Sequence, residues 1–149
     1  MSKTRQSPKA ETLAMARTIG SVLLESVDLH TVVLYGSAAR GELRGGTEMA
    51  SDVDVAVAGD EPLPIDRRLE LASRLALAVR RDVDLVDLRV AHGLLLKEIL
   101  TTGRFLRKEC PDFVAEKMIE MYDYELFLAP QLREARRERI AGLDRTLSQ

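Results

Sequence analysis

The sequence predicts a single α/β (α+β) domain in which helices cover a small mixed β-sheet. The length is the first observation: 149 residues suit one domain with its own core and are too few for two full domains. The composition is the second, because 46% hydrophobic and 31% charged residues exclude a disordered or low-complexity chain. The third is the alternation of short β-branched runs with longer segments of helical periodicity.

Two helices and two strands are expected in the first half of the chain. Apolar residues recur every three or four positions over 11–28, which predicts an amphipathic helix. The β-branched run 31–35 and the alternating segment 52–58 predict two strands. Between them, the polar segment 37–48 predicts a loop that starts with one helical turn. A second amphipathic helix is expected over 65–80.

The second half continues this alternation and then becomes helical. A third strand is expected over 83–88, a short helix over 94–100 and an edge strand over 104–108. A long helix follows over 111–128, and Pro130 can open a last helix whose arginines and glutamates resemble a solvated face. Five side chains of the long helix are expected to point inward: Phe113, Met118, Met121, Tyr122 and Leu126.

Charge and cysteine content restrict the class of protein. Twenty-two basic and 24 acidic residues give a net charge of −2, which argues against nonspecific nucleic-acid binding. The lone Cys110 cannot form an internal disulfide and fits a reducing compartment. Residues 1–10 do not resemble a signal peptide, and no apolar run is long enough to span a membrane. A cytoplasmic protein is therefore expected.

Acidic residues occupy unusual places on the predicted strands. Asp52 and Asp54 flank Val53, so their side chains share one face of a strand, and Asp84 lies within the next strand. Such carboxylates repel one another unless a cation lies between them. Mg²⁺ prefers carboxylate oxygens, and two such ions can assist phosphoryl or nucleotidyl transfer. Asp87 lies on the opposite face of its strand and is expected to be structural.

A glycine–serine turn follows the first predicted strand. Gly36 allows a sharp turn and a close approach of the backbone to a ligand. Backbone amides and the Ser37 hydroxyl can donate to phosphate oxygens, and Arg40 can add positive charge. The pattern is neither a Walker P-loop nor a dinucleotide fingerprint, because both need more glycines at fixed places.

These three motifs together resemble those of a known family. Residues 36–41 (GSAARG), 51–57 (SDVDVAV) and 83–88 (VDLVDL) are similar to the minimal nucleotidyltransferases of the DNA polymerase β superfamily. Within it, they are most similar to the MntA antitoxins of HEPN–MNT toxin–antitoxin pairs. The resemblance covers about residues 31–90. The spacer 38–51 is longer than is usual in the family, and its extra residues are expected within 43–50.

The resemblance implies a fold and a set of site residues. A polymerase-β-like core would span about 11–108 of a single 1–149 domain, with C-terminal helices over about 111–145. Gly36, Ser37 and Arg40 would hold ATP. Two Mg²⁺ ions would be bound by Asp52, Asp54 and Asp84, and Asp84 would also accept the proton of the attacking hydroxyl. Asp82 shares the face of Asp84 and is the alternative third carboxylate.

The resemblance also implies an activity and a partner. The protein would transfer AMP from ATP to a tyrosine hydroxyl of a cognate HEPN ribonuclease toxin and so act as its antitoxin. A protein acceptor suits a chain with no room for a separate substrate domain. Two alternatives remain: an antitoxin that neutralises its partner by binding alone, and a nucleotidyltransferase that modifies a small molecule such as an aminoglycoside.

Overall fold

A computed structural model describes residues 7–42 and 51–149 of the chain. Within those ranges the elements alternate as the sequence predicts, and the α/β class is confirmed. In chain order they are α1 (Pro8–Val22), β1 (Leu29–Tyr35), α2 (Gly36–Arg40), β2 (Val53–Gly59), α3 (Ile65–Val79), β3 (Val83–Asp87), α4 (Gly93–Thr102), β4 (Arg104–Lys108), α5 (Pro111–Asp123), the π-helical segment η1 (Tyr124–Leu128) and α6 (Ala129–Leu147).

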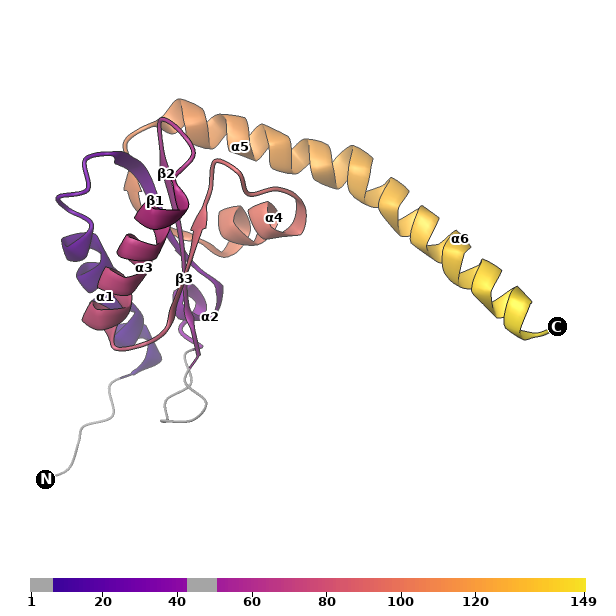
Figure 1. Ribbon diagram of the computed structural model, residues 1–149, viewed down its shortest axis with the longest axis horizontal. Coiled ribbons are helices and arrows are strands. Elements are labelled where there is room, and N and C mark those ends of the chain that lie inside the picture. The colour runs from indigo at the N-terminus through magenta and orange to yellow at the C-terminus, as the bar shows by residue number, and fades with distance from the viewer. Residues whose placement is uncertain (1–6, 43–50) are drawn as a thin grey trace, which may run out of the picture.

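The four strands form one mixed sheet in the order β3-β2-β1-β4 (Figure 1). β1 runs antiparallel to both β2 and β4, whereas β2 and β3 are parallel and are connected by α3. The carboxyl end of β1 therefore meets the amino ends of β2 and β3 at one end of the sheet. The predicted site residues belong to that end.

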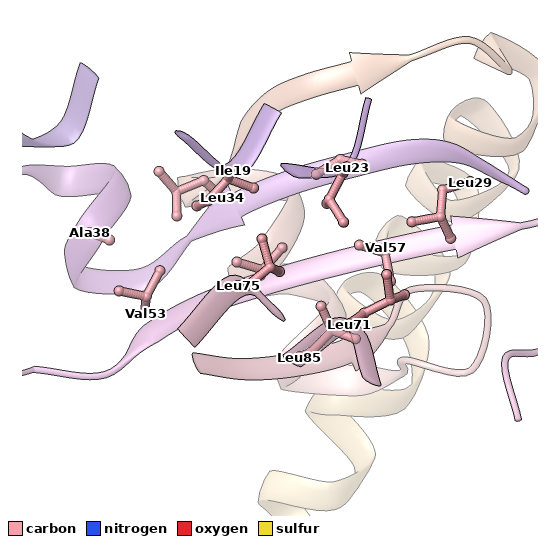
Figure 2. Close-up of a cluster of buried hydrophobic side chains, with 12 residues drawn as sticks. Ile19, Leu23, Leu29, Leu34, Ala38, Val53, Val57, Leu71, Leu75 and Leu85 are labelled. Atoms are coloured by element: carbon pink, nitrogen blue, oxygen red, sulfur yellow. The ribbon is translucent and has the colours of Figure 1, made fainter. Parts of the chain in front are cut away.

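Helices cover both faces of the sheet. On one face, Ile19 and Leu23 of the α1 segment and Leu71 and Leu75 of α3 pack against the strands (Figure 2). On the other face, a second cluster joins β1 and β2 to α4 and α5; it contains Val33, Tyr35, Ala56, Leu96, Ile99 and Phe113. Both faces of the central strands are therefore buried, because two helical layers enclose them.

The first helix differs from its predicted bounds at both ends. It begins at Pro8, where the Ser7 hydroxyl caps it by accepting the Ala10 N–H at 3.3 Å, rather than at residue 11. It ends at Val22 rather than near residue 28. Arg107 of β4 donates to backbone carbonyls of residues 23, 26 and 29, so a tertiary contact holds this connection out of the helix.

The C-terminal helices extend away from the sheet. Figure 1 shows α5, η1 and α6 as one long, nearly continuous helix whose end lies far from the other elements. We call residues 124–147, which form η1 and α6, the helical arm. No helix within the described ranges is long and apolar enough to cross a membrane.

Only part of the predicted inner face of this long helix is buried. Phe113 and Met121 are buried, as expected. Met118, Tyr122 and Leu126 are exposed to 39%, 59% and 67%, so the prediction for these three is wrong. The reason is that α5 contacts the core along a narrow stripe and that the helix leaves the sheet beyond Asp123. A large apolar surface remains on the arm.

Candidate active site

The glycine–serine turn packs directly against an acidic side chain. Gly36 follows β1 with φ of +69°, a conformation that side chains disfavour. A Cβ atom built on Gly36 would lie 2.4 Å from Oδ2 of Asp54, closer than such atoms can approach. Glycine is therefore required here by the backbone conformation and by the neighbouring carboxylate. The first and second predicted motifs meet at this point.

Asp54 and Asp84 lie side by side on neighbouring strands. In the β1–β2 register Asp54 is opposite Tyr35, and in the parallel β2–β3 register it is opposite Asp84. Residues at the same register on neighbouring strands project from the same face, and such strands lie about 4.8 Å apart. Asp54 is half-buried and Asp84 is exposed, so the pair opens to solvent at the end of the sheet.

The electrostatics of this end are strongly negative. Burial raises the pKa of the Asp54 carboxyl, and the charges of Asp84, Glu98 and Asp52 raise it further, while Arg40 opposes them. Burial also raises the pKa of the Tyr35 hydroxyl, with further contributions from Asp54, Asp84 and Glu98. In the described part of the chain, no lysine or arginine forms an ion pair with Asp54 or Asp84. This arrangement favours the binding of a cation.

The remaining predicted residues surround the acidic pair less closely. Asp52 lies just before β2 and is exposed. Ser37 is half-buried in α2, and Arg40 ends α2 with its Nε atom 3.0 Å from Oε2 of Glu42. Asp82 precedes β3, and its carbonyl accepts the Val53 N–H at 2.9 Å. The longer loop expected at 43–50 lies outside the described residues.

The carboxylates of this site suit Mg²⁺ that keeps water and phosphate ligands, and they do not form a complete metal site from protein ligands alone. Among residues 7–42 and 51–149, no three histidine, cysteine, aspartate or glutamate side chains converge closely enough to hold a metal by themselves. Mg²⁺ is commonly bound by one or two carboxylates, while waters and substrate phosphates complete the octahedron. The paired Asp54 and Asp84 supply two such carboxylates, with Asp52 close by.

Asp87 has the structural role that its parity predicts. Its side chain is buried, Oδ2 accepts the Leu63 N–H at 2.7 Å, and Oδ1 accepts the Arg89 N–H at 2.9 Å. Both carboxylate oxygens are therefore used to fasten the loops at the far end of β3. This acid is separate from the pair at the other end.

Two residues of the acidic end were not predicted from the sequence. Glu98 of α4 influences both Asp54 and Tyr35, and Tyr35 itself lies opposite Asp54 on β1. Glu98 carries no motif signal, because it reaches the site only through the packing of α4 against α2 and β1. Tyr35 directly precedes Gly36 on a predicted strand, so its position could have indicated its proximity to the turn.

The fold and the acidic pair together define a nucleotidyltransferase, and the chain belongs to the family "Polymerase beta, Nucleotidyltransferase", whose model matches residues 17–110. The predicted family is thereby confirmed. One relative is the protein adenylyltransferase MntA of Shewanella oneidensis, 37% identical over 98 residues, which cover 64% of this chain and 68% of the relative.

Two solved structures are similar over nearly the whole chain. One is a toxin–antitoxin crystal structure with AMP-PNP, with a TM-score of 0.60 and 28% identity over 89% of this chain and 98% of the other. The second is a complex of tri-AMPylated Shewanella oneidensis HEPN toxin with MNT antitoxin. Its TM-score is 0.58, with 26% identity over 91% of this chain and 98% of the other. These matches agree with the resemblance inferred from the motifs.

Proposed function

We propose that this protein is an antitoxin that transfers AMP from ATP to a tyrosine hydroxyl of a cognate HEPN toxin. The observation that carries the proposal is the contact between Gly36 and Asp54, with Asp84 beside them, because it joins a phosphate-binding turn to a carboxylate pair. Support also comes from the relatives, which include a protein adenylyltransferase and a complex with a tri-AMPylated HEPN toxin.

The nucleotide would be held at the glycine–serine turn. Gly36 lets the backbone turn sharply beside Asp54, the Ser37 hydroxyl can donate to a phosphate oxygen, and Arg40 adds positive charge nearby. The similarity to a structure that contains AMP-PNP supports ATP as the nucleotide. Asp52, Asp54 and Asp84 would bind Mg²⁺, which supplies charge neutralisation to the phosphates when bound.

The reaction transfers an adenylyl group to oxygen. The acceptor hydroxyl attacks the α-phosphorus of ATP, and a new P–O bond forms as the bond to the bridging oxygen of the β-phosphate breaks. AMP becomes attached to the acceptor and pyrophosphate leaves. Asp84 accepts the hydroxyl proton, because it is the exposed member of the pair. Asp82, two residues earlier in the chain, is the alternative acceptor of this proton.

The test measures transfer of labelled AMP to the cognate toxin with Mg²⁺ and ATP. Wild-type protein should label the toxin, whereas Asp52→Asn and Asp54→Asn should reduce the rate by at least about 100-fold. Asp60→Asn is the matched control, because Asp60 is exposed beyond the other end of β2. Label transfer that survives both site substitutions would exclude the assigned mechanism.

The same variants address neutralisation by binding alone. The exposed apolar side chains of the helical arm are the observation that favours this alternative, since they provide surface for a stable complex. Toxin ribonuclease activity is measured with the Asp54→Asn variant present. Inhibition equal to that of wild type would show that binding is sufficient.

A further inference from the structure

One edge of the sheet remains open next to the acidic pair. β3 is the last strand in the order β3-β2-β1-β4. Val53 donates its N–H to the Asp82 carbonyl and Leu88 donates its N–H to the Val57 carbonyl, so the even-numbered residues of β3 face β2. The backbone groups of Val83 and Leu85 therefore point to the open edge, where no described strand pairs with them.

A groove runs along this edge between β3 and α3. Its volume is about 260 Å³, and its walls are Ile65, Arg68, Leu69 and Ala72 of α3 together with residues 83–85 of β3. Ile65 and Leu69 are 65% and 62% exposed although they are large and apolar. The Nε atom of Arg68 is buried and has no hydrogen-bond partner among the described residues. The groove thus offers apolar contacts beside the open strand edge.

The geometry of the reaction indicates which side of the site the acceptor occupies. Across the sheet, the Gly36 turn comes first, then Asp54, then Asp84, and then the open edge of β3. Attacking and leaving oxygens lie on opposite sides of the phosphorus in such a transfer. If the leaving phosphates lie at Gly36 and Ser37, the acceptor hydroxyl approaches from the side of Asp84.

We propose that an extended segment of the acceptor protein binds this edge as an additional strand of the sheet. This inference rests on the proposed function, since it specifies how the protein substrate reaches Asp84. The segment would pair with the open backbone groups of Val83 and Leu85. Strand addition of this kind gains affinity from main-chain hydrogen bonds and specificity from alternate side chains.

Successive side chains of an added strand point to opposite faces of the sheet, so the strand can contact both Asp84 and the groove. An added strand lies about 4.8 Å from β3, so the side chain opposite Asp84 lies on the face that carries the carboxylates. Its two neighbours lie on the other face, against Ile65 and Leu69 in the groove. A small molecule would use neither the strand edge nor the alternating contacts.

The helical arm is a rival contact surface for the acceptor. Its exposed apolar residues include Leu126, Phe127 and Leu132. Its first residues contact α4, where Glu125 pairs with Lys97 at 3.0 Å, and α6 then extends away from the sheet (Figure 1). An acceptor held by the arm alone would leave the open edge of β3 unpaired. The experiments below distinguish the two surfaces.

The first experiment changes the groove without changing the acidic pair. The double variant Ile65→Glu, Leu69→Glu should raise KM for the toxin at least about tenfold, while the affinity for AMP-PNP stays unchanged. The control is Leu77→Glu, which changes a residue of α3 that is 82% exposed and does not line this groove. An unchanged KM in the double variant would overturn the inference, provided that wild type labels the toxin. Absence of labelling by wild type would instead contradict the proposed function.

The second experiment uses only wild-type proteins and does not depend on catalysis. Hydrogen exchange is followed at the backbone amides of Val83 and Leu85 before and after the toxin is added in the presence of AMP-PNP. Strand addition should slow exchange at both amides at least about tenfold. Protection confined to the helical arm, with these two amides unchanged, would overturn the inference even if transfer occurs.

Discussion

In the candidate site, Asp54 occupies the space in which a side chain of residue 36 would lie. The positive φ and the nearby carboxylate oxygen act together, so a side chain at position 36 is opposed by the backbone and by Asp54. At the scale of single residues, this contact connects the geometry of the turn to the position of the carboxylate. A change at Gly36 therefore affects stability and activity at once.

Gly36→Ala should lower the free energy of unfolding by about 1–2 kcal/mol, the usual cost of a left-handed non-glycine residue, and should strongly reduce AMP transfer. Thermal unfolding and transfer rates measure the two effects. Gly20→Ala is the control, because an added Cβ at Gly20 in α1 meets nothing within 4 Å. That control should leave activity intact and raise stability by about 0.5–1 kcal/mol. Wild-type activity in Gly36→Ala would contradict the role of the Gly36 turn in nucleotide binding.

The raised pKa of Asp54 predicts a pH-dependent stability. The folded state holds this proton at pH values where the unfolded chain releases it, so stability falls as pH rises from the usual Asp range through the raised pKa. Asp54→Asn removes the charge and should give a higher Tm than wild type at pH 7 without Mg²⁺. Below about pH 4 the difference should vanish, because both side chains are then neutral. A lower Tm for the variant at pH 7 would contradict the burial of charge.

At this scale the sequence predicts the motif residues but not all of their neighbours. Gly36, Asp54 and Asp84 are recognisable because strand alternation and a glycine turn determine their relative placement. Their catalytic roles remain predictions. Glu98 was missed because its contribution depends on how α4 packs across the sheet, and residue spacing carries no information on that packing.

At the scale of elements, β3 has different functions at its two ends. Its amino end carries Asp84 beside Asp54, while its carboxyl end carries the buried Asp87. Asp87 holds the segment before α3 through Leu63 and the turn after β3 through Arg89. The crossover between the two parallel strands is thus fixed by one carboxylate.

Asp87→Ala should destabilise the fold by about 1–3 kcal/mol, because it leaves two backbone N–H groups without their acceptor. Urea unfolding measures the loss. At a temperature where the variant is folded, KM for ATP should remain near that of wild type, since Asp87 lies away from the acidic pair. A selective loss of nucleotide binding with normal stability would contradict this structural role.

The strands were predicted to within one or two residues, whereas the limits of α1 were not. Short β-branched runs bounded by glycine or polar residues define strands well. Ser7 and Pro8 are a recognisable helix start that the hydrophobic periodicity alone does not reveal. The early end of α1 depends on Arg107, a residue distant in sequence, so local patterns could not predict it.

At the scale of the whole molecule, the chain consists of an α/β core and a helical arm. α6 contacts chiefly η1 within the described structure, and its apolar side chains Leu132, Ile140 and Leu143 are exposed. The sequence predicts these helices but not their direction, because helical periodicity does not show whether an apolar stripe faces the same chain or a partner. The exposed stripe is typical of an interaction surface.

Removal of residues 130–149 should leave the core folded. The arm contributes few contacts to the sheet, so Tm should change by less than about 2–4 °C, the shift that about 1 kcal/mol produces in a domain of this size. Differential scanning calorimetry measures this change. AMP-PNP binding should be retained. A lower affinity for the toxin is expected if the arm is a contact surface. Global unfolding of the shortened chain would show that the arm supports the core.

The pairing of β1 with β4 has a consequence for how the protein is made. Thr31 pairs with Lys108 and Leu34 pairs with Arg104, so one side of β1 has no partner strand until β4 has been synthesised. Contacts between such distant segments slow folding, because the entropy of closing a long loop is lost before the contacts can stabilise the chain. Until residue 108 has emerged, the nascent chain exposes the apolar β1 edge. This interval is when the protein most needs protection from aggregation.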